Sequence, residues 1–317
     1  MLHGSPGIGK SAIVQSIAKE FGLLLIDLRL AQCDPTDLSG FPSVDPITKR
    51  ASYSPMSTFP LEGDVIPAGY NGWLLFLDEI NSANQTVMAA AYKLVLDRAI
   101  GQHKLHKNVA IVCAGNLETD NAIVEPMGTA MQSRMVHLEI ALDAEEWLEW
   151  ATSTGFDHRI ISFIRFKVSS LYTFSPDHGD KTYACPRSWE FANRLLPKGD
   201  AIPKELLPLL AGALSEGVAR EFAGFCSIYT NLPAIASILQ YPTLVEVPQE
   251  PSTLYALTGA LGESLTVTNA AGLMQYINRM PVEFQVLTMR SAIKRDSGLV
   301  AEATISEWIS TKSVELF

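Results

Sequence analysis

A glycine-rich phosphate loop stands at the start of the chain. Its residues are Gly4, Ser5, Pro6, Gly7, Ile8, Gly9, Lys10 and Ser11, a complete G-x-x-x-x-G-K-[ST] pattern. Glycines let the backbone curl so that successive N–H groups point at phosphate oxygens, while the lysine reaches the β- and γ-phosphates and the hydroxyl binds Mg²⁺. We therefore expect residues 4–11 to hold nucleotide phosphates and Ser11 to be a Mg²⁺ ligand.

Two carboxylates follow an apolar run further along the chain. The run 73–77 (WLLFL) leads directly into Asp78 and Glu79. A buried parallel strand would deliver such acids at its carboxyl end, the edge where ligands bind in open α/β sheets. We expect Asp78 to hold Mg²⁺ through water and Glu79 to orient and polarise an attacking water, because hydrolysis at phosphorus depends mainly on positioning and charge stabilisation.

Three single residues complete the candidate site. Asn116 follows the apolar run 109–114, and an amide at a strand tip can donate to a γ-phosphate and hold the attacking water. Arg134 stands between a predicted short helix at 128–134 and a strand at 135–140, and arginine stabilises the charge of a transferring phosphoryl group in cis or from a neighbouring subunit. Arg187 opens a helix that begins at Pro186; the helix dipole disfavours a cation there, and a phosphate would relieve this. A turn asparagine or a surface arginine would explain each residue taken alone, so these assignments depend on motif order.

The elements that must position these residues alternate between helix and strand. Helical spacing predicts a helix at 11–21 ended by Gly22, and another at 84–98. The short apolar run 23–28 predicts a buried parallel strand. Prolines interrupt 34–72, where 41–44 and 51–54 are predicted to form a hairpin around 45–49. Only three residues precede Gly4, although a phosphate loop normally follows a buried strand, so either that strand is truncated or the chain starts late relative to a longer protein.

Beyond residue 141 strands become hard to find, and the pattern is helical. A helix cap at Asp143 is expected from the acid three residues later. Tyr241–Pro251 is the best candidate for a linker because it contains three prolines. Further helices are predicted at 203–213, 215–226, 231–239, 267–279, 283–294 and 306–311.

Composition limits the classes of function. The formal net charge is −10 and the isoelectric point is near 5.1, which argues against general nucleic-acid binding. The four cysteines are far apart and show no C-x-x-C spacing, so we expect reduced thiols. His103 and His106 are too closely spaced and too isolated to indicate a metal site. The chain has no apolar run of membrane-spanning length and no leader at its N-terminus, which predicts a soluble, cytoplasmic protein.

The order and approximate spacing of these motifs resemble those of the AAA+ ATPases. In this resemblance residues 4–11 look like the Walker A loop, Asp78 and Glu79 like the Walker B acids, Asn116 like sensor 1, Arg134 like the arginine finger and Arg187 like sensor 2. The chain is most similar to the MoxR branch and its dynein-related relatives, through 34–42 (DPTDLSGFP), 77–81 (LDEIN) and 133–135 (SRM). The resemblance covers roughly the first 200 residues.

The resemblance implies a fold and an assembly. The fold class would be α/β, with the parallel five-stranded sheet of a P-loop NTPase in residues 1–141, a helical lid in 142–240 and a helical extension in 241–317. Subunits would form a ring, expected to be a hexamer, with ATP and Mg²⁺ at each boundary and Arg134 reaching into the next site. The hairpin would face the pore or substrate. The ring would remodel or mature a protein partner, which could carry a von Willebrand factor A domain.

Rival functions stay open at this stage. One is an ATP-gated motor or loader associated with DNA, which the acidic balance disfavours. Another is a nucleotide-dependent assembly scaffold with low turnover, which the intact Asp78, Glu79 and Arg134 disfavour. A GTPase is disfavoured because no N-K-x-D motif occurs, and a small-molecule kinase because paired acids suit water activation better.

Overall fold

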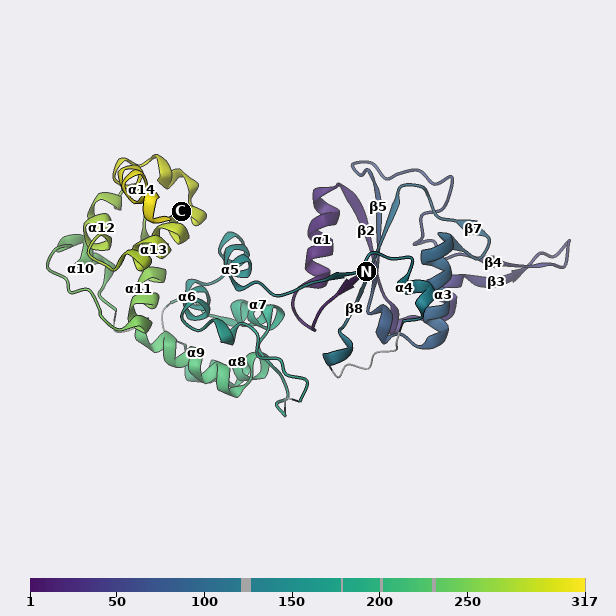
Figure 1. Cartoon of the computed structure of the whole chain (residues 1–317), viewed down its shortest axis with the longest axis horizontal. Coiled ribbons are helices and arrows are strands. Elements are labelled where there is room, and N and C mark those ends of the chain that lie inside the picture. Colours follow the sequence, from purple (N-terminus) through teal and green to yellow (C-terminus); the bar gives the residue numbers. More distant parts are fainter. Residues whose placement is uncertain (121–126, 178, 200–201, 230–231, 317) are drawn as a thin grey trace. The chain divides into compact units, whose positions relative to one another are not determined.

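The computed structural model describes residues 1–120, 127–177, 179–199, 202–229 and 232–316. The chain divides into two compact units, each with its own core. The first comprises Met1–Ala141 with Ser175–Asp177, and the second comprises Leu142–Phe174 and the remainder from residue 178 onward. The first unit is α/β, and the described residues of the second are helical apart from their connections (Figure 1).

A parallel five-stranded sheet forms the centre of the first unit. Its strands, in spatial order, are β2 (Leu23–Arg29), β5 (Gly72–Asp78), β8 (Val109–Gly115), β1 (Leu2–His3) and β9 (Leu138–Glu139). Every neighbouring pair is parallel. The predicted sheet is therefore confirmed. The strand before the phosphate loop is short, but Leu2 is paired with Ala114 on one side and with Leu138 on the other.

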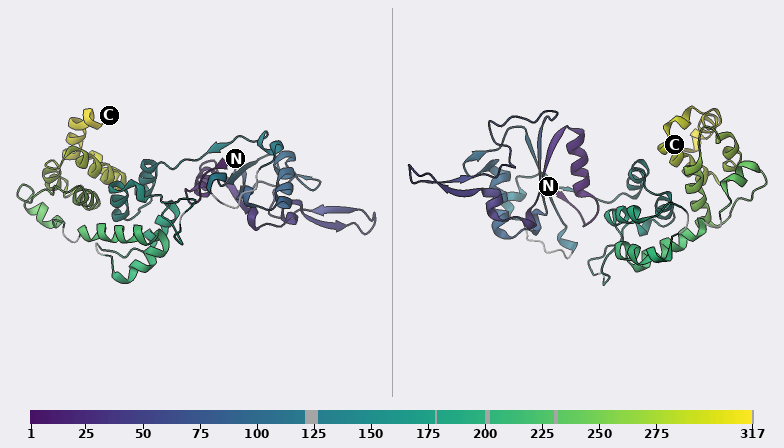
Figure 2. Two further views of the ribbon diagram at one scale, coloured as in Figure 1. Left: turned by 60° about the horizontal axis from the view of Figure 1, so that its bottom comes forward. Right: turned by 180° about the vertical axis from the view of Figure 1, so that it is seen from behind.

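Helices cover both faces of this sheet (Figure 1; Figure 2). α1 (Lys10–Glu20) packs Val14 and Ala18 against Leu74 and Phe76, whereas α3 (Gln85–Asp97) packs on the face that carries Trp73, Leu75 and Leu77. The side chains of β5 alternate between the two faces, as the period of two in a strand requires. All seven residues of β5 are buried, which explains its unbroken apolar sequence.

The prediction that 23–28 forms a buried strand is only half right. β2 is parallel to β5 along its whole length, but it lies at the edge of the sheet. Its residues are half-buried, and Asp27 and Arg29 are exposed. An edge strand has a neighbour on one side only, so the apolar run does not imply complete burial.

The proline-rich segment contains small elements. After η1 (Leu30–Gln32), α2 (Pro35–Ser39) begins at a capping box formed by Asp34 and Asp37. The predicted hairpin is confirmed, with β3 (Phe41–Val44) and β4 (Ala51–Ser54) antiparallel and Phe41 opposite Ser54. Both strands are exposed along their whole length.

The remaining elements of the first unit are short. A second small hairpin pairs β6 (Ala99–Ile100) with β7 (His103–Lys104) after α3. The other elements are η2 (Ile80–Ser82), η3 (Glu118–Asp120) and α4 (Thr129–Gln132). The predicted strand at 135–140 is confirmed but is only two residues long.

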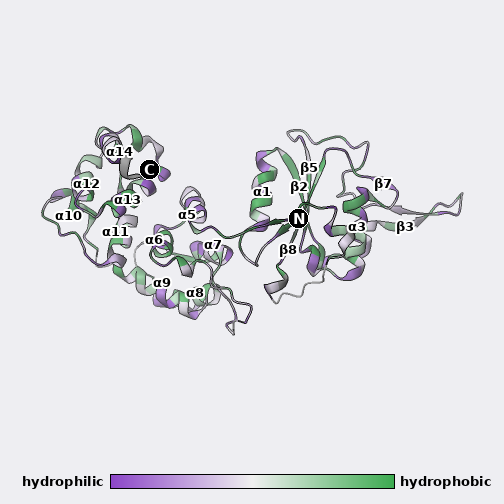
Figure 3. Cartoon of the chain, in the orientation of Figure 1, coloured by the Kyte–Doolittle hydropathy of each residue, from purple (hydrophilic) through white to green (hydrophobic). Residues whose placement is uncertain are grey.

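The second unit is a series of helices. They are α5 (Ala144–Ser153), α6 (His158–Phe166), η4 (Val168–Ser170), α7 (Pro186–Leu195), η5 (Lys204–Leu206), α8 (Leu207–Leu214), α9 (Glu216–Tyr229), α10 (Ile235–Gln240), α11 (Pro251–Ser264), α12 (Ala270–Ile277), α13 (Val282–Arg295), η6 (Ser297–Ala301) and α14 (Ala303–Leu316). Most carry both hydrophobic and hydrophilic residues, as amphipathic helices do (Figure 3). The predicted cap is confirmed, since the Asp143 carboxylate accepts the Glu146 N–H.

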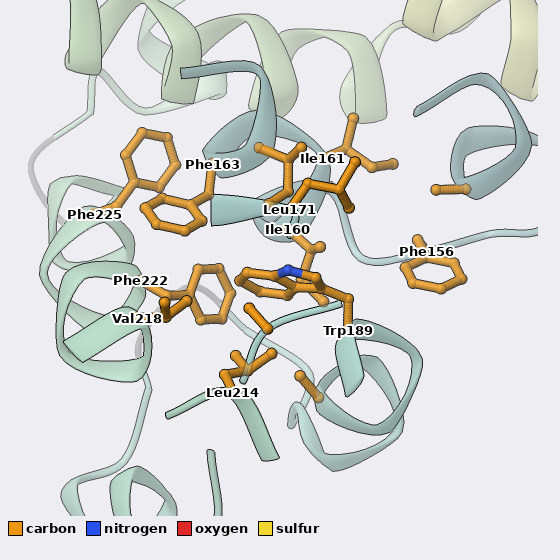
Figure 4. Packing of buried hydrophobic residues seen from close by; sticks show 14 of the residues in the cluster. Phe156, Ile160, Ile161, Phe163, Leu171, Trp189, Leu214, Val218, Phe222 and Phe225 are labelled. Carbon is orange, nitrogen blue, oxygen red and sulfur yellow. The ribbon is translucent and has the colours of Figure 1, made fainter. Parts of the chain in front are cut away.

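This unit contains two hydrophobic clusters. The first surrounds Trp189, which packs against Phe163 and Phe222 (Figure 4). The second is formed by α10 to α14. α11 contributes to both, through Ala256 to the first and Leu257 to the second. α11 was not predicted from the sequence, although Leu254, Leu257 and Leu261 have helical spacing, because the prolines just before it indicated a linker.

Two global expectations can be compared with the fold. All four cysteines are free thiols; Cys113, Cys185 and Cys226 are buried, and Cys33 is half-buried. Among the described residues, no helix combines the length and the apolar character needed to cross a membrane.

Candidate functional site

The phosphate loop connects β1 to α1 at the carboxyl edge of the sheet. Gly9 is the N-cap of α1 and has a φ of 103°, a left-handed conformation that glycine adopts without strain. The Ile13 N–H donates to the Gly9 carbonyl at 3.0 Å, which closes the first helical turn. No acidic residue stands in that turn. The positive end of the helix dipole therefore faces the loop without a competing carboxylate of its own, as an anion site requires.

The Lys10 side chain is folded back over this loop. Its ammonium donates to the Gly4 carbonyl at 2.5 Å, to the Ser5 carbonyl at 3.1 Å and to Asn116 Oδ1 at 3.1 Å. Lys10 is buried, with 9% of its surface exposed. Its charge is thus held where the tip of β8 meets the phosphate loop, two segments more than a hundred residues apart in the sequence.

Asp78 meets the first turn of α1. Because side chains alternate along β5, Asp78 shares the α1 face with Leu74 and Phe76. The Ser11 hydroxyl donates to Asp78 Oδ2 at 2.9 Å, and the Glu79 N–H donates to Asp78 Oδ1 at 2.9 Å. Ser11 and Asp78 therefore present neighbouring oxygen ligands of the kind that Mg²⁺ prefers. No group of three or more His, Cys, Asp or Glu side chains suited to a metal was found in the described part of the chain.

Glu79 has a strained backbone. Its φ of 56° and ψ of 36° are left-handed, which is uncommon for a residue with a side chain and costs about 1–3 kcal/mol. The strain falls at the point where β5 ends and the chain turns into η2, and the fully buried Ile80 anchors the turn on its far side. The surrounding structure, and not the intrinsic backbone preference of glutamate, therefore holds Glu79 in this conformation.

Two side chains that the sequence analysis did not assign also belong to this region. Asn81 is 5% exposed; its Nδ2 donates to the Asn116 carbonyl at 2.8 Å, and its Oδ1 accepts the Asn116 N–H at 3.2 Å. The second is Asp120, whose Oδ1 accepts a hydrogen bond from the Ser5 hydroxyl at 3.2 Å. Asn81 lies within the stretch 77–81 that carried the family resemblance, so position was the available signal. Nothing in the sequence pointed to Asp120.

A pocket of about 410 Å³ adjoins these residues. It is lined by His3, Asn81, Asn116, Leu117, Met127, Gln132 and His137. His3 and His137 stack, with His3 Nε2 and His137 Nδ1 2.9 Å apart. Because the Gln132 carbonyl can only accept, the His137 Nε2 in contact with it at 2.9 Å is a donor. The neutral pair then has His3 donating to His137.

The two arginines predicted for the site belong to different units of the chain. Arg134 is exposed, in the turn between α4 and β9. Arg187 is exposed at the second position of α7, in the second unit. Their action on a nucleotide stays a prediction.

Asp27 was not predicted for the site, but it responds electrostatically to Asp78. It lies on β2, opposite Phe76 on the neighbouring strand. Partial burial raises the pKa of Asp27, and the negative charge of Asp78 raises it further, against the opposing effect of Arg29. The edge of the sheet therefore concentrates negative charge where a cation would be favoured.

Comparison with known proteins agrees with this geometry. Residues 1–135 match the family described as "AAA domain (dynein-related subfamily)". A midasin from Giardia intestinalis is 34% identical over 96 residues, which is 30% of this chain and 2% of that protein's length. The chain therefore corresponds to a small part of that relative.

Solved structures give weaker likenesses. A candidate ATPase from Cytophaga hutchinsonii matches with 15% identity and a TM-score of 0.33, over 98% of this chain and 82% of that one. NtrX from Brucella abortus matches with 13% identity and a TM-score of 0.34, over 98% and 61%. Scores this low carry no argument about fold or function. The family match and the phosphate loop at the edge of the parallel sheet agree, so residues 1–135 are similar to an AAA domain of the dynein-related subfamily.

Proposed function

We propose that this chain binds and hydrolyses ATP as a subunit of an AAA+ ring and uses the energy to remodel a protein partner. The observation that carries the proposal is the convergence of Lys10, Ser11, Asp78 and Asn116, which come from three separate segments and are joined by hydrogen bonds at one edge of the sheet. This set combines a cation, two oxygen metal ligands and an amide, the groups needed to hold a metal-bound triphosphate.

Each residue has a role in the proposal. The backbone N–H groups of residues 4–11, apart from Pro6, which has none, bind the phosphates together with the Lys10 ammonium, and Ser11 and Asp78 hold Mg²⁺. The metal supplies charge neutralisation on the phosphate oxygens when bound. Glu79 orients the water, and Asn116 contacts the terminal phosphate. The turn at Glu79 suits this role, since strained residues cluster at functional sites.

The arginines extend the proposal beyond one active site. Arg134 is proposed to reach the nucleotide of the neighbouring subunit, and its exposure is compatible with that role. Arg187 is proposed to bind phosphate from the helical unit. We propose residues 142–240 as the lid and 241–317 as a helical extension.

The exposed hairpin is the proposed contact with substrate. Val44 and Ile47 are 65% and 88% exposed, which is unusual for side chains of this kind and typical of an interaction site. A MoxR-like role with a partner that carries a von Willebrand factor A domain, a hexameric ring and a cytoplasmic location belong to the same proposal.

The decisive experiment is the substitution Glu79→Gln. The amide keeps the size of the side chain but cannot accept the proton of the attacking water, so turnover should fall by about 100-fold or more while ATP binding stays within a few-fold of wild type. Steady-state phosphate release and nucleotide titration measure the two quantities. Unchanged turnover would remove Glu79 from the mechanism.

A pull-down tests the substrate class. Glu79→Gln protein held with ATP should retain a protein partner, whereas Lys10→Ala protein should not. Retention of DNA, with a salt dependence that reports several phosphate contacts, would favour the DNA-associated alternative instead.

A further inference from the structure

We propose that Asn81 is a positioning residue for the ATPase reaction, acting through Asn116. This inference rests on the proposed function. Asn81 binds the backbone of Asn116 on both sides and thereby fixes the Asn116 side chain against Lys10. The structure thus assigns a role to a residue that closes the stretch 77–81 but to which the sequence motifs give no function.

The contact imitates a strand. β5 and β8 are neighbouring parallel strands, and the last pair of residues in their register is Leu77 and Cys113. Three residues beyond Cys113, the side-chain amide of Asn81 takes the place of the missing strand, accepting the Asn116 N–H at 3.2 Å and donating to the Asn116 carbonyl at 2.8 Å. An asparagine side chain carries a donor and an acceptor in the arrangement of a peptide group, so it can satisfy both backbone groups at once.

The Asn81 amide also packs closely against the backbone of Gly115. A Cβ placed on Gly115 would lie 2.3 Å from Asn81 Oδ1 and 2.7 Å from its Cγ. Real Cβ atoms do not come this near, so a side chain at position 115 would expel the Asn81 amide. The same Cβ would lie 2.8 Å from Met1 Cε, so glycine at 115 leaves room for the Asn81 amide and for the Met1 side chain.

The consequence for chemistry comes from what Asn116 touches. Its Oδ1 accepts the Lys10 ammonium at 3.1 Å, and both asparagines line the same pocket. The short segment 78–81 thus contains the Asp78 carboxylate beside Ser11, the proposed water-orienting Glu79, and the amide that holds Asn116. Loss of that amide would let Asn116 move while the loop and Asp78 stay in place, so the chemical step should suffer more than nucleotide binding.

The test compares Asn81→Ala with Asn84→Ala. Asn84 is a matched control because it has the same side chain three positions further on, is exposed, and caps α3 by accepting the Val87 N–H. Asn81→Ala should lower kcat by about ten- to a hundredfold, the usual effect of removing a residue that orients a functional group, while KM for ATP changes less than about threefold. Asn84→Ala should leave both within about twofold.

Two further measurements separate positioning from general damage. Deuterium exchange of the segment containing Asn116 should accelerate in Asn81→Ala and stay unchanged in Asn84→Ala. Gly115→Ala should lower kcat in the same way, and the double variant with Asn81→Ala should be no worse than the more impaired single variant, because both break one contact.

The outcomes distinguish the two proposals. A wild-type chain without ATP turnover overturns the proposed function and the catalytic claim with it. Normal wild-type turnover together with an unimpaired Asn81→Ala overturns the positioning role alone, as does a parallel loss of kcat and ATP affinity. Loss of kcat with retained affinity, faster exchange at Asn116 and a non-additive double variant supports it.

Discussion

Removing one charge from a buried cluster in the helical unit should destabilise that unit strongly. Arg159 is fully buried. The Asp157 carboxylate accepts hydrogen bonds from Arg159 Nε at 2.9 Å and from Arg159 Nη2 at 2.7 Å. Arg159 Nη2 also donates to the Pro197 carbonyl at 2.8 Å. The Asp157 N–H donates to Asn193 on α7, so the cluster joins α6 to the helix that carries Arg187.

Asp157→Asn isolates the effect of the charge. An asparagine still caps α6, as Asp157 now does for the Arg159 N–H, but it leaves the guanidinium without its counterion. Breaking a buried ion pair by removing one partner costs about 3–5 kcal/mol, and we expect about 3 kcal/mol because the remaining oxygen still accepts one bond. For a domain of this size the melting temperature should fall by about 6–12 °C.

The assay is thermal unfolding followed by tryptophan fluorescence. Four of the five tryptophans lie in this unit, including Trp147 and Trp189 of the hydrophobic cluster around Trp189, so most of the signal reports it; Trp73 lies in the first unit. Arg194→Ala is the control: it removes an exposed pair with Glu190, in which the arginine is 67% exposed, and should cost less than about 1 kcal/mol. Equal shifts for the two variants would refute the reasoning.

The same cluster predicts a pH dependence. Burial alone would raise the pKa of Asp157, yet the hydrogen bonds and charge of Arg159 hold it below the ordinary value of 3.8. A lowered pKa means that ionised Asp157 stabilises the fold at all pH values above 3.8, and that this stability is lost as the pH falls through the folded-state pKa. The difference between wild type and Asp157→Asn should therefore be present at pH 7 and shrink as the pH falls below 3.8 towards the folded-state pKa.

Three other experiments test residues in or near the proposed site. Mixing Arg134→Ala subunits with Lys10→Ala subunits should restore part of the ATPase activity, because some interfaces then combine an intact loop with an intact arginine; mixtures that never exceed the single variants would argue against a finger in trans. Arg187→Ala should weaken ATP affinity or turnover about tenfold, as loss of a phosphate contact does, and a normal titration would make it an ordinary surface residue. Asp27→Asn should raise the unfolding midpoint near pH 7, because the raised pKa of Asp27 means that its ionised form destabilises the fold above 3.8; a gain that persists below pH 3.8 would contradict this cause.

Sequence alone was sufficient for the parts of the fold that rest on local rules. The phosphate loop with its helix and the buried strand before Asp78 were predicted from residue pattern, and both are present. The hairpin of β3 and β4 follows from two short runs around a turn, and its predicted bounds match the structure. The N-cap of α1 is Gly9, one of the glycines of the phosphate-loop pattern, in a left-handed conformation.

Predictions from local sequence failed where burial depends on neighbouring elements of the fold. The half-exposure of β2 depends on its place at the edge of the sheet, which no feature of 23–28 reveals. α11 was hidden because its apolar spacing begins among prolines, and its burial against two clusters is a property of the packed unit.

The chemistry of the site divides in the same way. Residue types and their order predicted Lys10, Ser11, Asp78 and Asn116 as site residues, because phosphate and Mg²⁺ restrict which side chains can bind them. Only the tertiary structure could show that Asn81 holds Asn116. An asparagine also occurs commonly in turns, and a Cβ at position 115 would lie only 2.3 Å from Asn81 Oδ1, so the contact depends on the absence of a side chain there. Sequence order specifies which groups are available, whereas side-chain contacts between distant segments exist only once the sheet has brought its strand ends together.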